Sequence, residues 1–156
     1  MKLDSVDVRL LAELQQDGRR SVVELAERVG LSPTPCARRI RQLEEDGVIQ
    51  GYAAQLDPVR LGLSVRAFVQ VKLERHTDET VTRFNEALAA IDEVVNCYAT
   101  TGDHDFMLQV LAADLGSLSD IVLRSLLRIP GVRDVKSSLA LETVKHSSRI
   151  PLRHLR

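Results

Sequence analysis

The spacing of the apolar residues changes near residue 62, and this change constrains the fold more than any other feature. Up to residue 46, apolar residues recur every three or four positions, which predicts short amphipathic helices. Between Val65 and Leu73 they alternate with mostly polar residues, which predicts a half-buried strand. A chain of 156 residues has room for two small domains. We therefore expect an α+β protein with a helical first unit and a sheet-containing second unit.

The first two helices are marked by residues that start and stop helices. Asp4 or Ser5 can cap the first helix, and Gly18 can end it. Ser21–Glu24 forms a capping box, in which the hydroxyl and the carboxylate each accept a hydrogen bond from an unpaired backbone N–H. Gly30 then stands where a left-handed residue would end the second helix.

A third helix is predicted to start at Pro33, with Ser32 as its N-cap, and to run to about Glu45 or Asp46. At about 100° per residue, one side of this helix is apolar and carries Cys36, Ile40 and Leu43. The opposite side carries Thr34, Arg38 and Arg41, with Arg39 and Gln42 on a flank.

A short polar helix face with guanidinium groups suits the major groove of DNA. Arginine pairs with guanine through two hydrogen bonds, and threonine can meet a base edge or a thymine methyl group. Two short helices joined by a turn at Gly30, the second bearing such a face, predict a helix-turn-helix. A plain three-helix bundle with an exposed arginine helix remains the alternative.

Positive charge is clustered although the net charge is −1. The clusters are Arg38, Arg39 and Arg41, the pair Arg19 and Arg20, and a basic tail with Lys145, Arg149, Arg153 and Arg156. Attraction to phosphate is local at physiological salt, so such clusters matter more for DNA binding than the net charge of the chain. Each could equally be a solvated surface, and the tail could contact DNA, a neighbouring subunit or only water.

The second unit follows the order strand, helix, strand, strand, helix, strand, which predicts a ferredoxin-like sheet with both helices on one face. The strands are expected at 65–73, 94–100, 105–112 and 132–141, with helices starting near Thr77 or Asp78 and at a cap on Ser117. Phe68, Gln70 and Lys72 would belong to the open face, which suggests association with a second copy.

Four segments follow from these patterns, with an extended wing or hinge strand expected over residues 48–56. They are a winged helix-turn-helix at 1–50, a hinge at 51–62, a sheet-containing oligomerisation domain at 63–145, and the basic tail at 146–156.

Several classes of protein are not expected. The longest apolar run, Ala87–Ile91, is far shorter than the about 20 residues of a membrane span, and no secretory signal is visible at the start. The two cysteines fit neither a zinc site nor a disulfide framework, so a reducing cytoplasm is expected. Asp103–Asp105 could resemble a metal or acid–base cluster, but further ligands at suitable spacing are missing. We expect no enzyme activity, no catalytic residue, no metal and no cofactor.

The chain resembles the Lrp/AsnC (leucine-responsive or feast–famine) regulators over nearly its whole length. Linked motifs carry the resemblance: Arg28–Cys36, Gly47–Tyr52, Thr101–Phe106, Leu127–Val132 and Glu142–Lys145. Within the first of these motifs, Ser32–Cys36 also points to the leucine-responsive branch of the family. The resemblance implies a sequence-specific transcription regulator with a winged helix-turn-helix and an ACT-like effector domain. It also implies dimers that commonly assemble into octamers, double-stranded DNA as a partner, and a free amino acid bound between effector domains of different dimers.

The resemblance and the charge pattern together supply candidate site residues. For DNA these are Ser32, Thr34, Pro35, Arg38, Arg39, Arg41, Gln42, Arg19 and Arg20. For the effector they are Ala99, Thr101, Gly102, Asp103, His104, Asp105, Leu115, Ser138, Leu139 and Ala140.

The effector loop also has a physical rationale. Gly102 allows close backbone approach of a carboxylate, Asp103 or Asp105 could accept an ammonium group, and Ala99 and Leu115 could flank an apolar side chain. The alternative is a hairpin turn whose aspartates bond only to backbone. His104 and the small residues at 137–138 differ from the residues common at these positions in the leucine branch. The resemblance therefore does not fix which amino acid is the effector. An architectural DNA-compacting protein without an effector is the alternative function.

Overall fold

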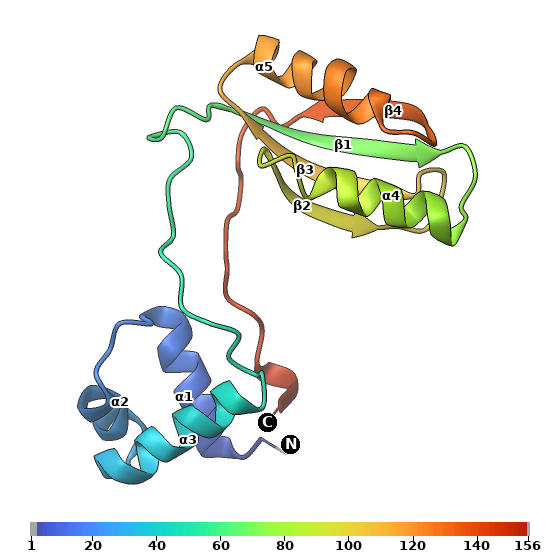
Figure 1. Cartoon of the computed structure of the whole chain (residues 1–156). Helices are drawn as coiled ribbons and strands as arrows, with labels where there is room; N and C mark the ends of the chain where they lie inside the picture. Colours follow the sequence, from blue (N-terminus) through green and yellow to red (C-terminus); the bar gives the residue numbers. More distant parts are fainter. Residues whose placement is uncertain (1–2, 156) are drawn as a thin grey trace. The chain divides into compact units, whose positions relative to one another are not determined.

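A computed structural model describes residues 3–155, so Arg156 of the basic tail lies outside it (Figure 1). The chain divides into two compact units. The first contains the chain up to Gln55 together with the segment from Lys145 onward, and the second extends from Leu56 to Val144. No helix among the described residues is long and apolar enough to cross a membrane.

Three helices form the first unit: α1 at Ser5–Gln16, α2 at Val22–Val29 and α3 at Pro33–Glu45. Asp4 caps α1 and Ser21 caps α2, each in a complete capping box. Gly30 ends α2 with a φ of 73°, in the left-handed region that glycine adopts without steric cost. These three boundaries confirm the predicted helices.

The apolar stripes of the three helices meet in one small core. Leu10, Leu25 and Val29 pack there against Cys36 and Ile40, and all five side chains are buried. Since Cys36 and Ile40 come from the predicted inner side of α3, burial fixes which side of this helix faces solvent.

A four-stranded antiparallel sheet with strand order β2-β3-β1-β4 forms the second unit. Its elements are β1 (Val65–Leu73), α4 (Asp78–Leu88), β2 (Val94–Ala99), β3 (Phe106–Ala112), α5 (Leu115–Asp120) and β4 (Val132–Leu139). This order confirms the ferredoxin-like expectation and the α+β class.

Both helices of this unit pack on the same sheet face. Ala67, Val69 and Val71 of β1 are fully buried in one core with Phe84 of α4 and Leu118 of α5. The rings of Phe84 and Phe106 stack with centroids 4.6 Å apart. On the other face, Phe68 is 42% exposed, so one apolar ring of the sheet faces solvent within a single chain.

The second helix of the sheet unit differs from the prediction. Asp114, and not Ser117, is its N-cap, because the Asp114 carboxylate accepts a hydrogen bond from Ser117 N at 2.7 Å. After α5 the helix continues as a π-helical segment, Ile121–Ser125, and a 3₁₀ turn, Leu126–Arg128.

The expected wing strand over residues 48–56 is not formed within the described chain. A strand needs a neighbouring strand for its backbone hydrogen bonds. Apart from this segment and the C-terminal tail, the first unit offers only helices and their connecting turns.

Candidate functional site

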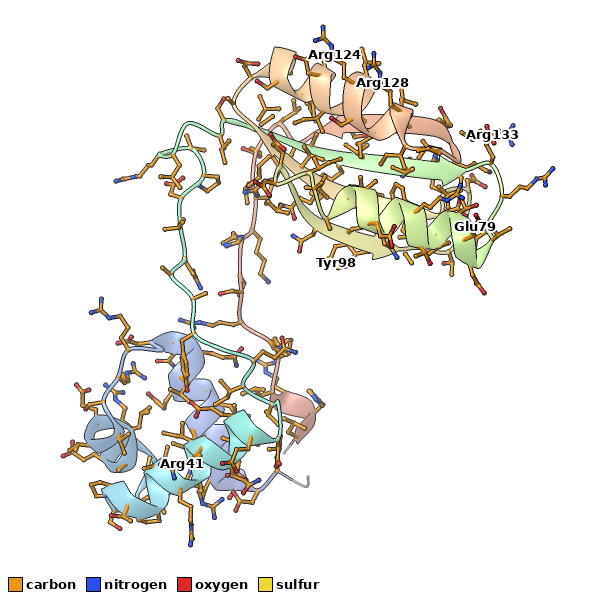
Figure 2. The ribbon with its side chains drawn as sticks, in the orientation of Figure 1. Arg41, Glu79, Tyr98, Arg124, Arg128 and Arg133 are labelled. Atoms are coloured by element: carbon orange, nitrogen blue, oxygen red, sulfur yellow. The ribbon has the colours of Figure 1, made fainter. Side chains whose placement is uncertain are left out.

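The outer face of α3 is the first candidate site. Thr34, Arg38 and Arg41 are exposed, while Cys36 on the opposite side has no accessible surface. Among residues 3–155, no hydrogen bond or ion pair holds the side chain of Arg38 or Arg41; Figure 2 labels Arg41 on this helix. Two guanidinium groups are thus available to a partner without breaking an internal contact.

The start of α3 adds polar groups to this face. Ser32 is the N-cap residue, yet its hydroxyl makes no capping hydrogen bond, and it is exposed. Pro35 belongs to the first turn of α3 and is half-buried. Pro33 and Pro35 have no N–H and Cys36 N donates to Ser32 O, so among the first four residues of α3 the Thr34 N–H is the one left to meet an anion such as a phosphate.

Arg39 is engaged inside the first unit. Its Nη1 lies 2.7 Å from Asp4 Oδ2 and 2.8 Å from Asp7 Oδ1, so the side chain joins α3 to the start of α1. The hydrogen bonds to Asp7 and then Asp4 raise the pKa of Arg39. The backbone hydrogen bond from Asp7, followed by the Arg39 guanidinium, holds the pKa of Asp4 below its ordinary value.

The remaining candidate DNA contacts fall into two groups. Arg20 pairs with the carboxylate of Glu13 and donates to its backbone oxygen, so this side chain also supports the fold. Arg19 is exposed, and Gln42 Nε2 donates to Asp46 Oδ1 at 2.9 Å.

Tyr52 is a residue of this unit that sequence patterns did not single out. Its hydroxyl donates to Glu44 Oε1 at 2.9 Å, and its ring contacts Gly18. Burial, followed by the hydrogen bond with Glu44, raises the pKa of Tyr52 to about 12. The contact fixes the segment after α3 against the end of that helix.

The loop between β2 and β3 is the second candidate site. Gly102 has a φ of 112°, and Thr100 closes the loop by donating from N to Asp105 O at 2.9 Å and from Oγ1 to His104 O at 3.1 Å. The Asp105 carboxylate accepts from Leu73 N at 2.7 Å and faces the His76 ring. Asp105 is thus used by the fold, whereas Asp103 is exposed.

The candidate effector residues lie at two opposite ends of the sheet. Phe106, next to the loop, pairs with Val71 near the end of β1, while Leu139 pairs with Ala67 near its start. Four residues of strand separate these pairs by roughly 13 Å. Ala99 and Thr101–Asp105 lie at one end; Leu115 and Ser138–Ala140 lie at the other.

A hollow of about 500 Å³ lies beside the loop, lined by Asp103 and His104 and by four residues that the sequence did not suggest. These are Lys72 of β1 and Arg133, Asp134 and Lys136 of β4. The pairing of β1 with β3 and with β4 brings them to the loop; the alternating pattern placed Lys72 on the open face, and no local pattern marks the three residues of β4.

The described residues form neither a metal-binding cluster nor a reactive thiol. Within residues 3–155, no group of three or more His, Cys, Asp or Glu side chains could hold a metal ion. Burial raises the pKa of both the Cys36 and the Cys97 thiol, so neither is activated as a thiolate.

A helix-turn-helix with an exposed arginine helix, followed by a ferredoxin-like unit, defines a DNA-binding protein with a separate regulatory domain. Family models confirm both parts: an AsnC-type helix-turn-helix domain matches residues 3–44, and an Lrp/AsnC ligand binding domain matches residues 66–150. The chain belongs to the Lrp/AsnC family of transcription regulators.

Individual relatives cover almost the whole chain. The leucine-responsive regulatory protein of Escherichia coli K12 is 42% identical over 151 residues, 97% of this chain and 92% of the relative. A transcriptional regulator of Neisseria meningitidis, solved in complex with L-Met, has a TM-score of 0.94 at 41% identity and 99% coverage of each chain. An AsnC family regulator of Agrobacterium tumefaciens has a TM-score of 0.92 at 39% identity, covering 97% of this chain and 99% of its own.

Proposed function

We propose that α3 contacts the bases or phosphates of double-stranded DNA through Arg38 and Arg41, with Thr34 nearby. One observation carries this proposal: α3 buries Cys36, Ile40 and Leu43 while both arginines stay exposed and unpaired within the described chain. Residues 1–50 would then bind DNA, and residues 63–145 would bind the effector and other subunits.

Binding to DNA tests the arginine face directly. An operator selected from a random duplex library would be titrated with Arg38→Ala and Arg41→Ala at fixed salt. Each loss should cost about 1–3 kcal/mol and relax the preference at one base. Arg124→Ala, an exposed arginine of the second unit, serves as the control. Unchanged binding by both α3 variants would disprove this assignment.

We propose a free amino acid as the effector. The support is the matching ligand-binding domain and the L-Met complex of the Neisseria relative. The separation of the candidate residues at two sheet ends fits a site shared between copies, since one chain alone cannot bring them together. The ligand-binding domain also favours a regulator over an architectural protein without an effector.

We propose a homodimer through the open sheet face, and the family resemblance suggests that such dimers assemble further, up to an octamer. Phe68 and Tyr98 are 42% and 59% exposed there, and apolar rings on an open face favour a partner. A single recognition helix also covers too little DNA for strong specificity, whereas a dimer reads two half-sites. Since the relatives are transcription regulators, we place this activity in the cytoplasm and expect no enzyme activity.

Thermal unfolding in the presence of each amino acid tests the effector assignment. A ligand that binds only the native state stabilises it by about 2.7 kcal/mol at one hundred times its Kd. Sedimentation of the same samples reports whether the ligand shifts the assembly state, which requires different affinities for the two states. The absence of any stabilisation at millimolar concentrations would contradict an amino-acid effector.

A further inference from the structure

A groove runs between α1 and the C-terminal tail. Both of its walls belong to the helical unit, because the segment from Lys145 onward clusters with the three helices. Gln15 of α1 fixes the tail in place through hydrogen bonds to the backbone N and O of Ile150, at 2.6 and 3.2 Å. The groove has a volume of about 760 Å³, which is in the range of small-molecule sites.

Much of the groove is lined by apolar side chains. Val8 and Ala12 come from α1, and Leu152 and Leu155 come from the tail. Ile150, which also lines the groove, is 68% exposed although its backbone is held by Gln15. Docking of the tail therefore leaves apolar surface that an alkyl chain would remove from water.

Arginine supplies all the charge of the groove. Arg9 comes from α1 and Arg149 and Arg153 from the tail, and none of the described residues that line the groove is acidic. Arg9 is positioned by a hydrogen bond from Nη2 to Val29 O at 3.1 Å. Arg149 and Arg153 are exposed, and neither joins an ion pair within residues 3–155. This charge selects an anion, because guanidinium groups form charge-assisted hydrogen bonds with carboxylates.

DNA held by α3 lies on a different side of the helical unit. Since successive residues of a helix are rotated by about 100°, Ala12 in the groove lies opposite Leu10 on α1. Leu10 faces the core shared with α2 and α3, and Arg38 and Arg41 point away from that core on the outer face of α3. The groove arginines are therefore not aligned with the proposed DNA contacts, and they fit a different anion.

We propose that this groove binds an aliphatic monocarboxylic acid, such as a medium-chain fatty acid. The carboxylate would bond to Arg9, Arg149 and Arg153, and the alkyl chain would cover Val8 and Leu152. A free amino acid fits this groove less well, because its ammonium group would lie among guanidinium groups without a carboxylate to pair with. The site lies in the helical unit, so the inference does not rest on the proposed amino-acid effector.

Calorimetric titration of the whole protein with octanoate tests the ligand class. Octanoate should bind at least about tenfold more tightly than octylammonium, which has the same chain and the opposite charge, and than butyrate, which has the same charge and a shorter chain. Equal binding of octylammonium would reveal an apolar surface without charge selection, and equal binding of butyrate would reveal a general anion patch. Either result, or no binding of octanoate, would overturn the inference.

Substitutions and hydrogen exchange locate the ligand. Arg149→Gln and Arg153→Gln change exposed side chains, so folding should be preserved, and each should weaken octanoate binding about tenfold. Arg128→Gln makes the same change of charge in the sheet unit and should bind octanoate normally (Figure 2). Octanoate should also slow amide exchange in peptides of both α1 and the tail, because it joins the two walls.

Two outcomes would assign the ligand or the groove differently. If both tail variants bind octanoate as tightly as the unchanged protein, or if protection from exchange appears only in the sheet unit, the ligand lies elsewhere and the inference is wrong. If the tail variants sediment as smaller assemblies and the unchanged protein binds no octanoate, a second copy occupies the groove and the inference is likewise wrong.

Discussion

The side-chain amide of Gln15 pairs with both backbone polar groups of Ile150. Its Nε2 donates to Ile150 O at 3.2 Å, and its Oε1 accepts from Ile150 N at 2.6 Å. Leu152 and Leu155 line a groove with Val8 of α1 beside this contact. The basic tail, for which the sequence allowed three environments, thus lies along α1 and becomes part of the helical unit.

Replacing Gln15 by Ala should release the tail locally. The substitution removes both hydrogen bonds, and at about 1 kcal/mol for each this corresponds to about thirtyfold faster amide exchange at Ile150. Mass-spectrometric hydrogen exchange of the C-terminal peptide measures this change. Gln16→Ala is the matched control, because it lies on the same helix and its side chain makes no hydrogen bond within the described residues. Equal exchange in both variants would show that the apolar contacts alone hold the tail.

Substitutions of the neighbouring residues Arg38 and Arg39 should have different effects, one on DNA binding and the other on the stability of the helical unit. Arg39→Ala leaves the buried Asp7 without its cation and should destabilise the helical unit by about 1–2 kcal/mol. Arg38→Ala should change stability by less than about 0.5 kcal/mol, because its side chain is exposed. Denaturant unfolding followed by circular dichroism measures both. An Arg39→Ala protein that unfolds like the unchanged chain but binds DNA weakly would place Arg39 on the DNA.

The features that the sequence predicted correctly depend on contacts within one helical turn. The Ser21 capping box joins residues three positions apart, and the left-handed Gly30 follows directly from the end of α2. The buried side of α3 likewise follows from its 3.6-residue period. Such features are accessible because neighbours in space are neighbours in the chain.

Features that depend on tertiary contacts were not accessible in this way. The helical wheel placed Arg39 on a flank, but its partners Asp4 and Asp7 lie on another helix. Asp114 and Ser117 are both good capping residues, and the choice depends on β3 ending at Ala112. The hollow beside the loop likewise requires the register between β1 and β4, which no local pattern encodes.

Tyr52 should ionise near pH 12, well above its ordinary value of 10.0. Because the native pKa is raised, the stability that this tyrosine contributes is complete below pH 10.0 and is lost as the pH rises towards about 12. Ultraviolet titration of Tyr98→Phe, which keeps Tyr52 as the single tyrosine, measures the value directly. Adding Glu44→Gln removes the neighbouring carboxylate and should lower the pKa towards 10.0; no decrease would leave burial as the whole cause.

Gly131 should tolerate no side chain, since it has a φ of 91° and a Cβ there would lie 2.5 Å from Thr80 Cγ2. Gly62→Ala provides the control, because Gly62 has a φ of 86° but no atom within 4 Å of a built Cβ. Both alanines should incur about 1–2 kcal/mol of backbone strain, and Gly131→Ala should lose a further 1–3 kcal/mol, roughly, through overpacking. Adding Thr80→Ser removes the methyl group that clashes and should recover most of that additional loss. Equal thermal stability of the Gly131→Ala and Gly62→Ala proteins would show that α4 moves aside at negligible cost.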